Sequence, residues 1–265
     1  LIPYTVLGLV AGLVAVLFIV LLYRLEDAYD RWSFPEYLKP FTGGVLMALM
    51  DLYFPHVYGV GYESINGALH NQWPFWILVA MIFMKILATS VTLGSGGSGG
   101  IFAPSLFIGA ATGGAVGIIT GHIFPQAASS ATYALVGMGA LVAATTHAPI
   151  TAIIIIFELT QDYHIIPPLM FTCIISTLIA STVKQESIYT QKLELKGISL
   201  KEGKEESILK EIGVNRIVRD GTTFFEDMSL RQVIDEALRS TQTVFPVLNR
   251  NGMLMGILTL NNLKT

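Results

Sequence analysis

Five long apolar stretches constrain the fold of this chain more than any other feature of its sequence. Each is about as long as a helix that crosses roughly 30 Å of hydrocarbon. They occupy residues 1–23, 73–93, 101–120, 131–148 and 165–183. The first is too long for the core of a signal peptide and lacks the basic start of such a peptide. The pattern therefore predicts an all-α, multi-pass membrane protein embedded in lipid.

Charged residues are scarce and unevenly placed. They make up 13% of the chain, against about 25% in a typical soluble domain. Only 14 of the 35 charged residues precede residue 187, so a polar region follows the apolar one. The net charge of −3 and the lack of a basic stripe exclude a nucleic-acid partner. By the positive-inside tendency, the C-terminus is cytoplasmic, because five lysines follow the last apolar stretch: Lys184, Lys192, Lys196, Lys201 and Lys204.

Two further apolar runs are too short to cross a bilayer. One covers residues 150–157, and the other lies around residues 41–52. Short helices packed within the protein are typical of transporters that hold a substrate between broken helices. Lys85 and Glu158 also lie at membrane depth, where a charge is a candidate functional group. We expect Lys85 to snorkel or to pair within the bundle, and Glu158 to be an interface or packing residue.

The most informative segment covers residues 94–104 and reads GSGGSGGIFAP. It contains G-x-G-x-x-G, but an apolar helix rather than a strand precedes it, and no acidic residue follows about 20 positions later, so the dinucleotide reading fails. A helix start offers unpaired N–H groups and a partial positive charge, which hold an anion without a fixed cation. The candidate anion-binding residues are Gly100, Ile101, Phe102 and Ala103.

Pro104 supports a helix start at this point, because its missing N–H costs nothing in the first turn. Close packing of helices would also explain the glycines, and the residues alone leave both readings open. Four more glycines repeat at every fourth position and predict a tight contact between membrane helices: Gly109, Gly113, Gly117 and Gly121.

The polar C-terminal region has the patterns of a small α/β unit. Residues 197–206 read as a linker, and short β-type pieces follow at 214–225. Ser229 and Gln232 predict a capping box at the start of a helix. The expected apolar face of that helix comprises Leu230, Val233, Ile234, Ala237 and Leu238.

Two strand-like runs, at 243–248 and 253–259, follow this helix. Asn251 and Gly252 lie between them and are a strong hairpin signal. The region therefore predicts a β-α-β-β unit. A unit of that size buries little apolar surface and usually needs a partner.

Four motifs resemble the CLC family of chloride channels and chloride–proton exchangers. The family's G-x-F-x-P signature is similar to GGIFAP at 99–104, and its next Pro-started helix to HAPITAIIIIFELT at 147–160. The two later helices are similar to PPLM at 167–170 and SIYT at 187–190. The resemblance implies a CLC-type membrane domain over residues 1–196, the second inverted repeat of that fold, in a homodimer.

In that family, backbone amides after the signature glycine and a tyrosine hydroxyl coordinate the central chloride. The resemblance implies that Ile101 and Phe102 donate N–H groups, and Tyr189 its hydroxyl, to chloride as the transported ion, with no cofactor. Without the family, Tyr189 after Glu186 reads as a residue of an interfacial aromatic belt. Passive passage and proton-coupled exchange both stay open.

Two motifs of the family's first half, G-S-G-x-P and G-[KR]-E-G-P, do not occur in this sequence. The chain also lacks an initiator Met and opens on an apolar stretch. We therefore expect an N-terminal half to be missing, and this chain to hold one wall of a pore and not to conduct alone.

The C-terminal unit, residues 207–265, resembles a single CBS motif at 246–263. CBS motifs work in pairs, and pairs in this family can bind adenine nucleotides. The family's T-x-x-D pattern corresponds to Thr259 and Asn262, and the loss of the carboxylate weakens a ribose contact. Thr259 and Asn262 are thus secondary nucleotide candidates, and a structural, dimer-contact role is favoured. A membrane-anchored CBS sensor is the rival to a transporter.

An enzyme is disfavoured, because no nucleophile–base pair or metal set stands in a plausible pocket. The single Cys173 excludes a disulfide framework and reads as a small buried apolar residue. His147 precedes Pro149 and is expected to form local hydrogen bonds at a helix start. The other histidines lack the spacing of metal ligands.

Overall fold

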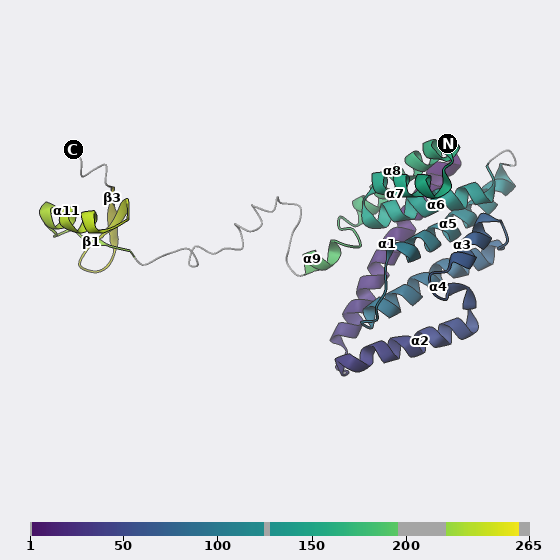
Figure 1. The fold of residues 1–265 in the computed structure, drawn as a ribbon, viewed down its shortest axis with the longest axis horizontal. Coiled ribbons are helices and arrows are strands. Elements are labelled where there is room, and N and C mark those ends of the chain that lie inside the picture. The colour runs from purple at the N-terminus through teal and green to yellow at the C-terminus, as the bar shows by residue number, and fades with distance from the viewer. Residues whose placement is uncertain (1, 125–127, 196–220, 260–265) are drawn as a thin grey trace. The chain divides into compact units, whose positions relative to one another are not determined.

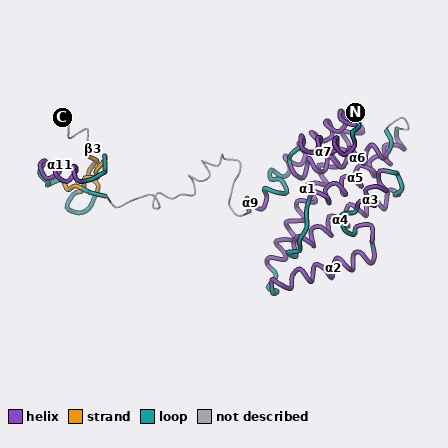
Figure 2. Tube along the Cα trace, viewed as in Figure 1, coloured by secondary structure: helices purple, strands orange, loops and turns teal. Residues whose placement is uncertain are grey.

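The computed structural model describes residues 2–124, 128–195 and 221–259, which fall into two units. The N-terminal unit is built of helices, and Figure 2 shows strands, among the described residues, in the C-terminal unit. The predicted linker at 197–206 lies outside the described residues. Nine α-helices and three 3₁₀ turns are described in the first unit: α1 (Ile2–Arg31), η1 (Glu36–Leu38), α2 (Lys39–Tyr53), η2 (Pro55–Val57), α3 (Tyr62–Leu69), α4 (Phe75–Gly94), α5 (Phe102–Ile123), α6 (Ser130–Thr146), α7 (Pro149–Thr160), η3 (Tyr163–Ile165), α8 (Ile166–Val183) and α9 (Gln191–Leu195).

Four of the predicted spanning stretches form helices that are long and apolar enough to cross a membrane. Within the described residues these are α1, α4, α5 and the continuous segment Tyr163–Val183. The fifth stretch forms α6, which has only 17 residues. The two short runs form α2 and the 12-residue α7, as predicted.

The break between α6 and α7 follows from local chemistry. Ser129 caps α6 by accepting a hydrogen bond from the N–H of Thr132. His147 ends α6 in the left-handed region, with φ of 56°. Pro149 then occupies the first position of α7, where its missing N–H costs nothing. The chain thus passes from α6 to α7 through His147 and Ala148 alone, without a long loop.

Helix α1 runs along the helical unit from the N-terminus and contacts α4, α6 and α8 (Figure 1). Two glycines bring α1 close to α8. A Cβ on Gly12 would lie 2.9 Å from the carbonyl oxygen of Ser176, and one on Gly8 would lie 2.8 Å from the side chain of Ile175. Small residues at this contact let the backbones approach, as is usual between membrane helices.

The predicted glycine ridge joins α5 to α6. A Cβ on Gly109 would lie 2.5 Å from the carbonyl oxygen of Gly137, and a Cβ on Gly113 or Gly117 would also meet α6. The prediction is therefore confirmed for these three residues. Gly121 differs, because a Cβ there would meet no atom within 4 Å.

Polar side chains in this core bind carbonyl oxygens of the helices themselves. Thr112 donates to Ile108 at 2.7 Å, and Ser176 donates across to Ala140 of α6 at 2.8 Å. Cys173 is fully buried in the same cluster, as predicted. A hydroxyl group in a region that water does not reach needs such a hydrogen-bond partner within the protein.

The C-terminal unit is a three-stranded sheet with one helix. Its elements are β1 (Phe224–Phe225), α11 (Leu230–Arg239), β2 (Val244–Leu248) and β3 (Leu254–Thr259), in the predicted β-α-β-β order. Strand β2 lies between β1, which is parallel to it, and β3, which is antiparallel. The hairpin turn carries Gly252 at φ of 77°, and the side chain of Asn249 accepts two backbone N–H groups there.

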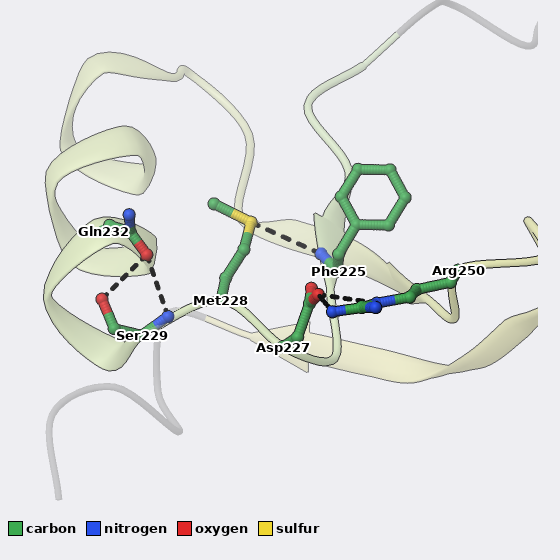
Figure 3. A network of polar contacts seen from close by, with 6 residues as sticks. All are labelled: Phe225, Asp227, Met228, Ser229, Gln232 and Arg250. Atoms are coloured by element: carbon green, nitrogen blue, oxygen red, sulfur yellow. Dashed lines mark hydrogen bonds and ion pairs between the residues drawn. The ribbon is translucent and has the colours of Figure 1, made fainter.

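The predicted capping box is present, with the backbone N–H and hydroxyl of Ser229 both donating to the Gln232 side chain (Figure 3). The predicted apolar face of α11 is partly wrong. Val233 and Ala237 are buried against Phe224 and Phe245, but Leu230 and Leu238 are 65% and 78% exposed. The sheet is too small to cover the full apolar stripe of the helix.

Candidate anion-binding site

Helix α5 begins where the sequence predicted. Ile101 is its N-cap and Phe102 its first residue, so Pro104 takes the third position. The first bond of the helical ladder joins the N–H of Ser105 to the carbonyl oxygen of Ile101 at 3.1 Å. The N–H groups of Ile101, Phe102 and Ala103 come before this first hydrogen bond of the helix, and the start of a helix carries a partial positive charge.

The glycine-rich segment divides into two parts with different roles. Gly96, at φ of 86°, and Gly97 close the end of α4: their N–H groups donate to the carbonyl oxygens of Leu93 and Thr92 at 3.0 and 2.9 Å. This is the Schellman arrangement that ends many helices. Gly100, by contrast, has open space where a Cβ would lie. Gly96 and Gly97 thus cap a helix, a role that neither reading of the glycines gave them, and the anion site at Gly100 stays a prediction.

Tyr189 lies in a turn over residues 187–190, just before α9. Within the turn, the N–H of Ser187 donates to the hydroxyl of Thr190 at 2.9 Å, and the N–H of Tyr189 donates to the hydroxyl of Ser187 at 3.3 Å. Ile188 is buried, whereas the Tyr189 side chain is 53% exposed. The backbone of the turn is thus fixed while the phenol is open.

A series of polar contacts joins this turn to the start of α5. The N–H of Ile188 donates to the carbonyl oxygen of Thr145 at 2.9 Å. The Thr145 hydroxyl donates to the carbonyl oxygen of Leu141 at 2.9 Å and lies 3.4 Å from the Ser105 hydroxyl. Ser105 in turn donates to the carbonyl oxygen of Ile101 at 2.8 Å. Thr145 and Ser105 are both buried. The last turn of α6 therefore holds the segment of Tyr189 beside the first turn of α5.

Sequence analysis did not single out Thr145 or Ser105. The only signal for Ser105 is its place directly after Pro104, in the first turn of α5. Thr145 stands in the last turn of α6, two residues before His147. Neither position differs in pattern from the other small polar residues of these helices, so the contact between them was not predictable.

The other predicted candidates lie elsewhere. Lys85 pairs within the bundle, as expected, and donates to the carbonyl oxygens of Val57 and Gly59. Glu158 is exposed on α7. Among the described residues, the Nε2 atom of His147 is buried without a hydrogen-bond partner, so the expected local hydrogen bond is not seen at that atom. Asn262 lies outside the described residues.

Comparison with known proteins covers the helical unit. The family model described as "Voltage gated chloride channel" matches residues 1–181, a segment that ends before Tyr189. A ClcB-like protein of Ralstonia nicotianae is 41% identical over 192 residues, which is 72% of this chain and 44% of that protein. The H(+)/Cl(-) exchange transporter ClcA of Yersinia pestis is 35% identical over 71% of this chain and 40% of its own length.

A solved structure agrees with these sequence matches. A slow cyanobacterial Cl−/H+ antiporter superposes with a TM-score of 0.67 and 32% identity, over 73% of this chain and 46% of that one. The chain thus spans less than half the length of the relatives it matches. With the family model covering more than half of its residues, the chain belongs to the voltage-gated chloride channel family.

Proposed function

We propose that this chain forms one wall of a pathway by which chloride, or a similar small anion, crosses a membrane either passively or coupled to protons. The observation that carries the proposal is the series of polar contacts from Ile101 through Ser105 and Thr145 to Ile188. Because Tyr189 follows Ile188 directly, these contacts support a site made of the exposed tyrosine and the first N–H groups of α5.

This arrangement suits an anion that must be released after it binds. Backbone dipoles at Ile101 and Phe102 attract the ion without the tight hold of a buried Lys or Arg. The Tyr189 hydroxyl supplies a neutral donor, and Gly100 leaves room for the ion to approach. The family match of the helical unit favours transport over a membrane-anchored sensor.

The rest of the pathway is assigned to a complementary half, because the relatives are more than twice as long as the matched segment. Phe102 and Tyr189 are both exposed, and the complementary half would cover them. We further propose that the assembled protein is a homodimer. Exposed apolar side chains of α7 and α8, such as Ile154 and Leu178, offer a face for lipid or a second subunit.

We assign the C-terminal unit to a single CBS motif on the cytoplasmic side, with a contact role rather than nucleotide binding. Strand β3 is an edge strand of the sheet. Its side chains Leu254, Met255 and Ile257 are exposed, which is the composition of a surface that a second motif covers.

Chloride efflux from liposomes tests the transport proposal. The 265-residue chain would be reconstituted alone and together with the N-terminal half of a related exchanger, and efflux would be followed with a chloride electrode. We expect efflux only from the combined halves, and its loss when Tyr189→Phe is combined with Pro104→Ala. The control is Tyr163→Phe, which changes an exposed tyrosine in η3. Unchanged efflux in the Tyr189/Pro104 variant contradicts the site, and selective efflux from the chain alone contradicts the half-pathway.

A further inference from the structure

Helix α1 is tied to the turn that carries Tyr189. The hydroxyl of Tyr23, near the C-terminal end of α1, donates to the carbonyl oxygen of Ile188 at 2.6 Å, although the two residues are 165 positions apart. Tyr23 is only 9% exposed and Ile188 only 1%. The bond is therefore shielded from water, where an unpaired carbonyl would be costly.

The Ile188 backbone is thereby held from two sides. Its N–H donates to Thr145 of α6 at 2.9 Å, and its carbonyl accepts from Tyr23 of α1. That carbonyl belongs to the peptide group that joins Ile188 to Tyr189, and the N–H of the same group donates to the Ser187 hydroxyl at 3.3 Å. Tyr23 therefore holds one side of the peptide plane from which the Tyr189 side chain projects. The backbone of this peptide sets the direction of the Tyr189 Cα–Cβ bond, from which the half-exposed phenol extends.

A second tie lies one helical turn further along the same two segments. Glu26 follows Tyr23 by three positions, and it forms an ion pair with Lys192 of α9. The hydrogen bond from its ammonium to the Glu26 carboxylate raises the pKa of Lys192. An exposed pair of this kind adds little stability, but it aligns the chain after Tyr189 along the end of α1.

We propose that Tyr23 is a positioning residue for Tyr189: its hydroxyl orients the peptide that carries the anion-binding phenol over the start of α5. The inference rests on the proposed function and deepens it. Loss of the hydroxyl would leave the Ile188 carbonyl without its donor. The turn would then rotate toward another donor, and Tyr189 would leave the position set by Thr145 and Ser105.

Kinetics of chloride efflux in the combined-halves liposomes test this role. For Tyr23→Phe we expect the chloride concentration at half-maximal rate to rise by about two- to tenfold, the range that one buried hydrogen bond supports, with a smaller change in the maximal rate. Tyr29→Phe is the matched control, since Tyr29 lies on the same helix, is 8% exposed and packs against Trp32. It should behave as the wild type.

A double variant separates positioning from general packing. If Tyr23 acts through Tyr189, the double variant Tyr23→Phe/Tyr189→Phe should be no worse than Tyr189→Phe alone, because coupled residues are not additive. Additive effects, or a half-maximal concentration for Tyr23→Phe equal to that of the Tyr29→Phe control, overturn the proposal.

Hydrogen exchange provides a readout that does not need transport. In the 265-residue chain, Tyr23→Phe should speed amide exchange across residues 187–190, and Tyr29→Phe should not. Equal exchange in the two variants overturns the positioning role. If the wild-type halves carry no chloride, the proposed function fails, and the exchange result alone then decides whether Tyr23 orders the turn.

Discussion

The ammonium of Lys85 in α4 donates to the carbonyl oxygen of Gly59 at 2.7 Å, in the loop after η2. It also donates to Val57 at 2.9 Å and lies 4.9 Å from the ring centre of Phe107 in α5. A single buried cation thus fastens the loop that precedes α3 to two membrane helices. The role is consistent with the rule that buried charges in membrane helices are paired with charges or carbonyls.

Lys85→Met should destabilise the helical unit. The change keeps an apolar stem but leaves two carbonyl oxygens without their charged donor, at a cost of about 2–3 kcal/mol. Reversible unfolding in mixed detergent and SDS would measure it. Lys192→Met is the control, because Lys192 is exposed and its ion pair is worth at most about 1 kcal/mol. Similar losses of unfolding free energy in the two variants would contradict this role of Lys85.

Gly109→Ala should disrupt the contact of α5 with α6. A methyl group there meets backbone atoms of Gly137 and Met138, which cannot rotate away, so we expect a loss of about 1–3 kcal/mol. Gly121→Ala, on the same helix but in open space, should be neutral or stabilising by up to about 1 kcal/mol, since Ala favours helix. The same unfolding assay compares them, and equal effects would refute tight packing at Gly109.

Thr145→Val should raise the chloride concentration at half-maximal efflux in the combined-halves assay. The variant keeps the shape of the side chain and removes the hydroxyl that faces Ser105. Thr146→Val is the closest available control, because the Thr146 hydroxyl bonds only within its own helix, to Val142. A shift in both variants, or in neither, would show that the link between α6 and α5 does not shape the site.

Ser229→Ala should weaken the C-terminal unit by about 1 kcal/mol, since it removes the N-cap side chain of α11. Thr243→Ala, an exposed change just before β2, should stay within about 0.5 kcal/mol. Urea unfolding followed by amide hydrogen exchange in α11 would compare them. An unaltered midpoint for Ser229→Ala would mean that the cap adds nothing.

Local chemistry explains which parts of the fold the sequence predicted. The glycines before residue 101 and the proline at 104 together predict that α5 starts at Ile101, because both residue types affect only the backbone within a few positions of themselves. The spacing of Gly109, Gly113 and Gly117 likewise predicts one helix face. The turn at Asn251 and Gly252 was predictable for the same reason.

Contacts between distant segments were not predictable from one sequence. Thr145 meets Ser105 across 40 positions, and Tyr23 meets Ile188 across 165. The spacing of residues along the sequence does not indicate which hydroxyl group contacts a distant segment. The wrong prediction for α11 has a related cause. The helical spacing of apolar residues places Leu230 and Leu238 on the predicted apolar face, but the size of the sheet decides which side chains of that face are covered.

The three glycines between α5 and α6 also limit how this protein can move. With backbone against backbone, the two helices have no side-chain layer to compress or slide, so the pair should move as one rigid block. Any change of shape that the proposed function requires must then be absorbed where the chain is not braced. The bridge from Ser98 to Gly100, between the closed end of α4 and the open start of α5, is such a place.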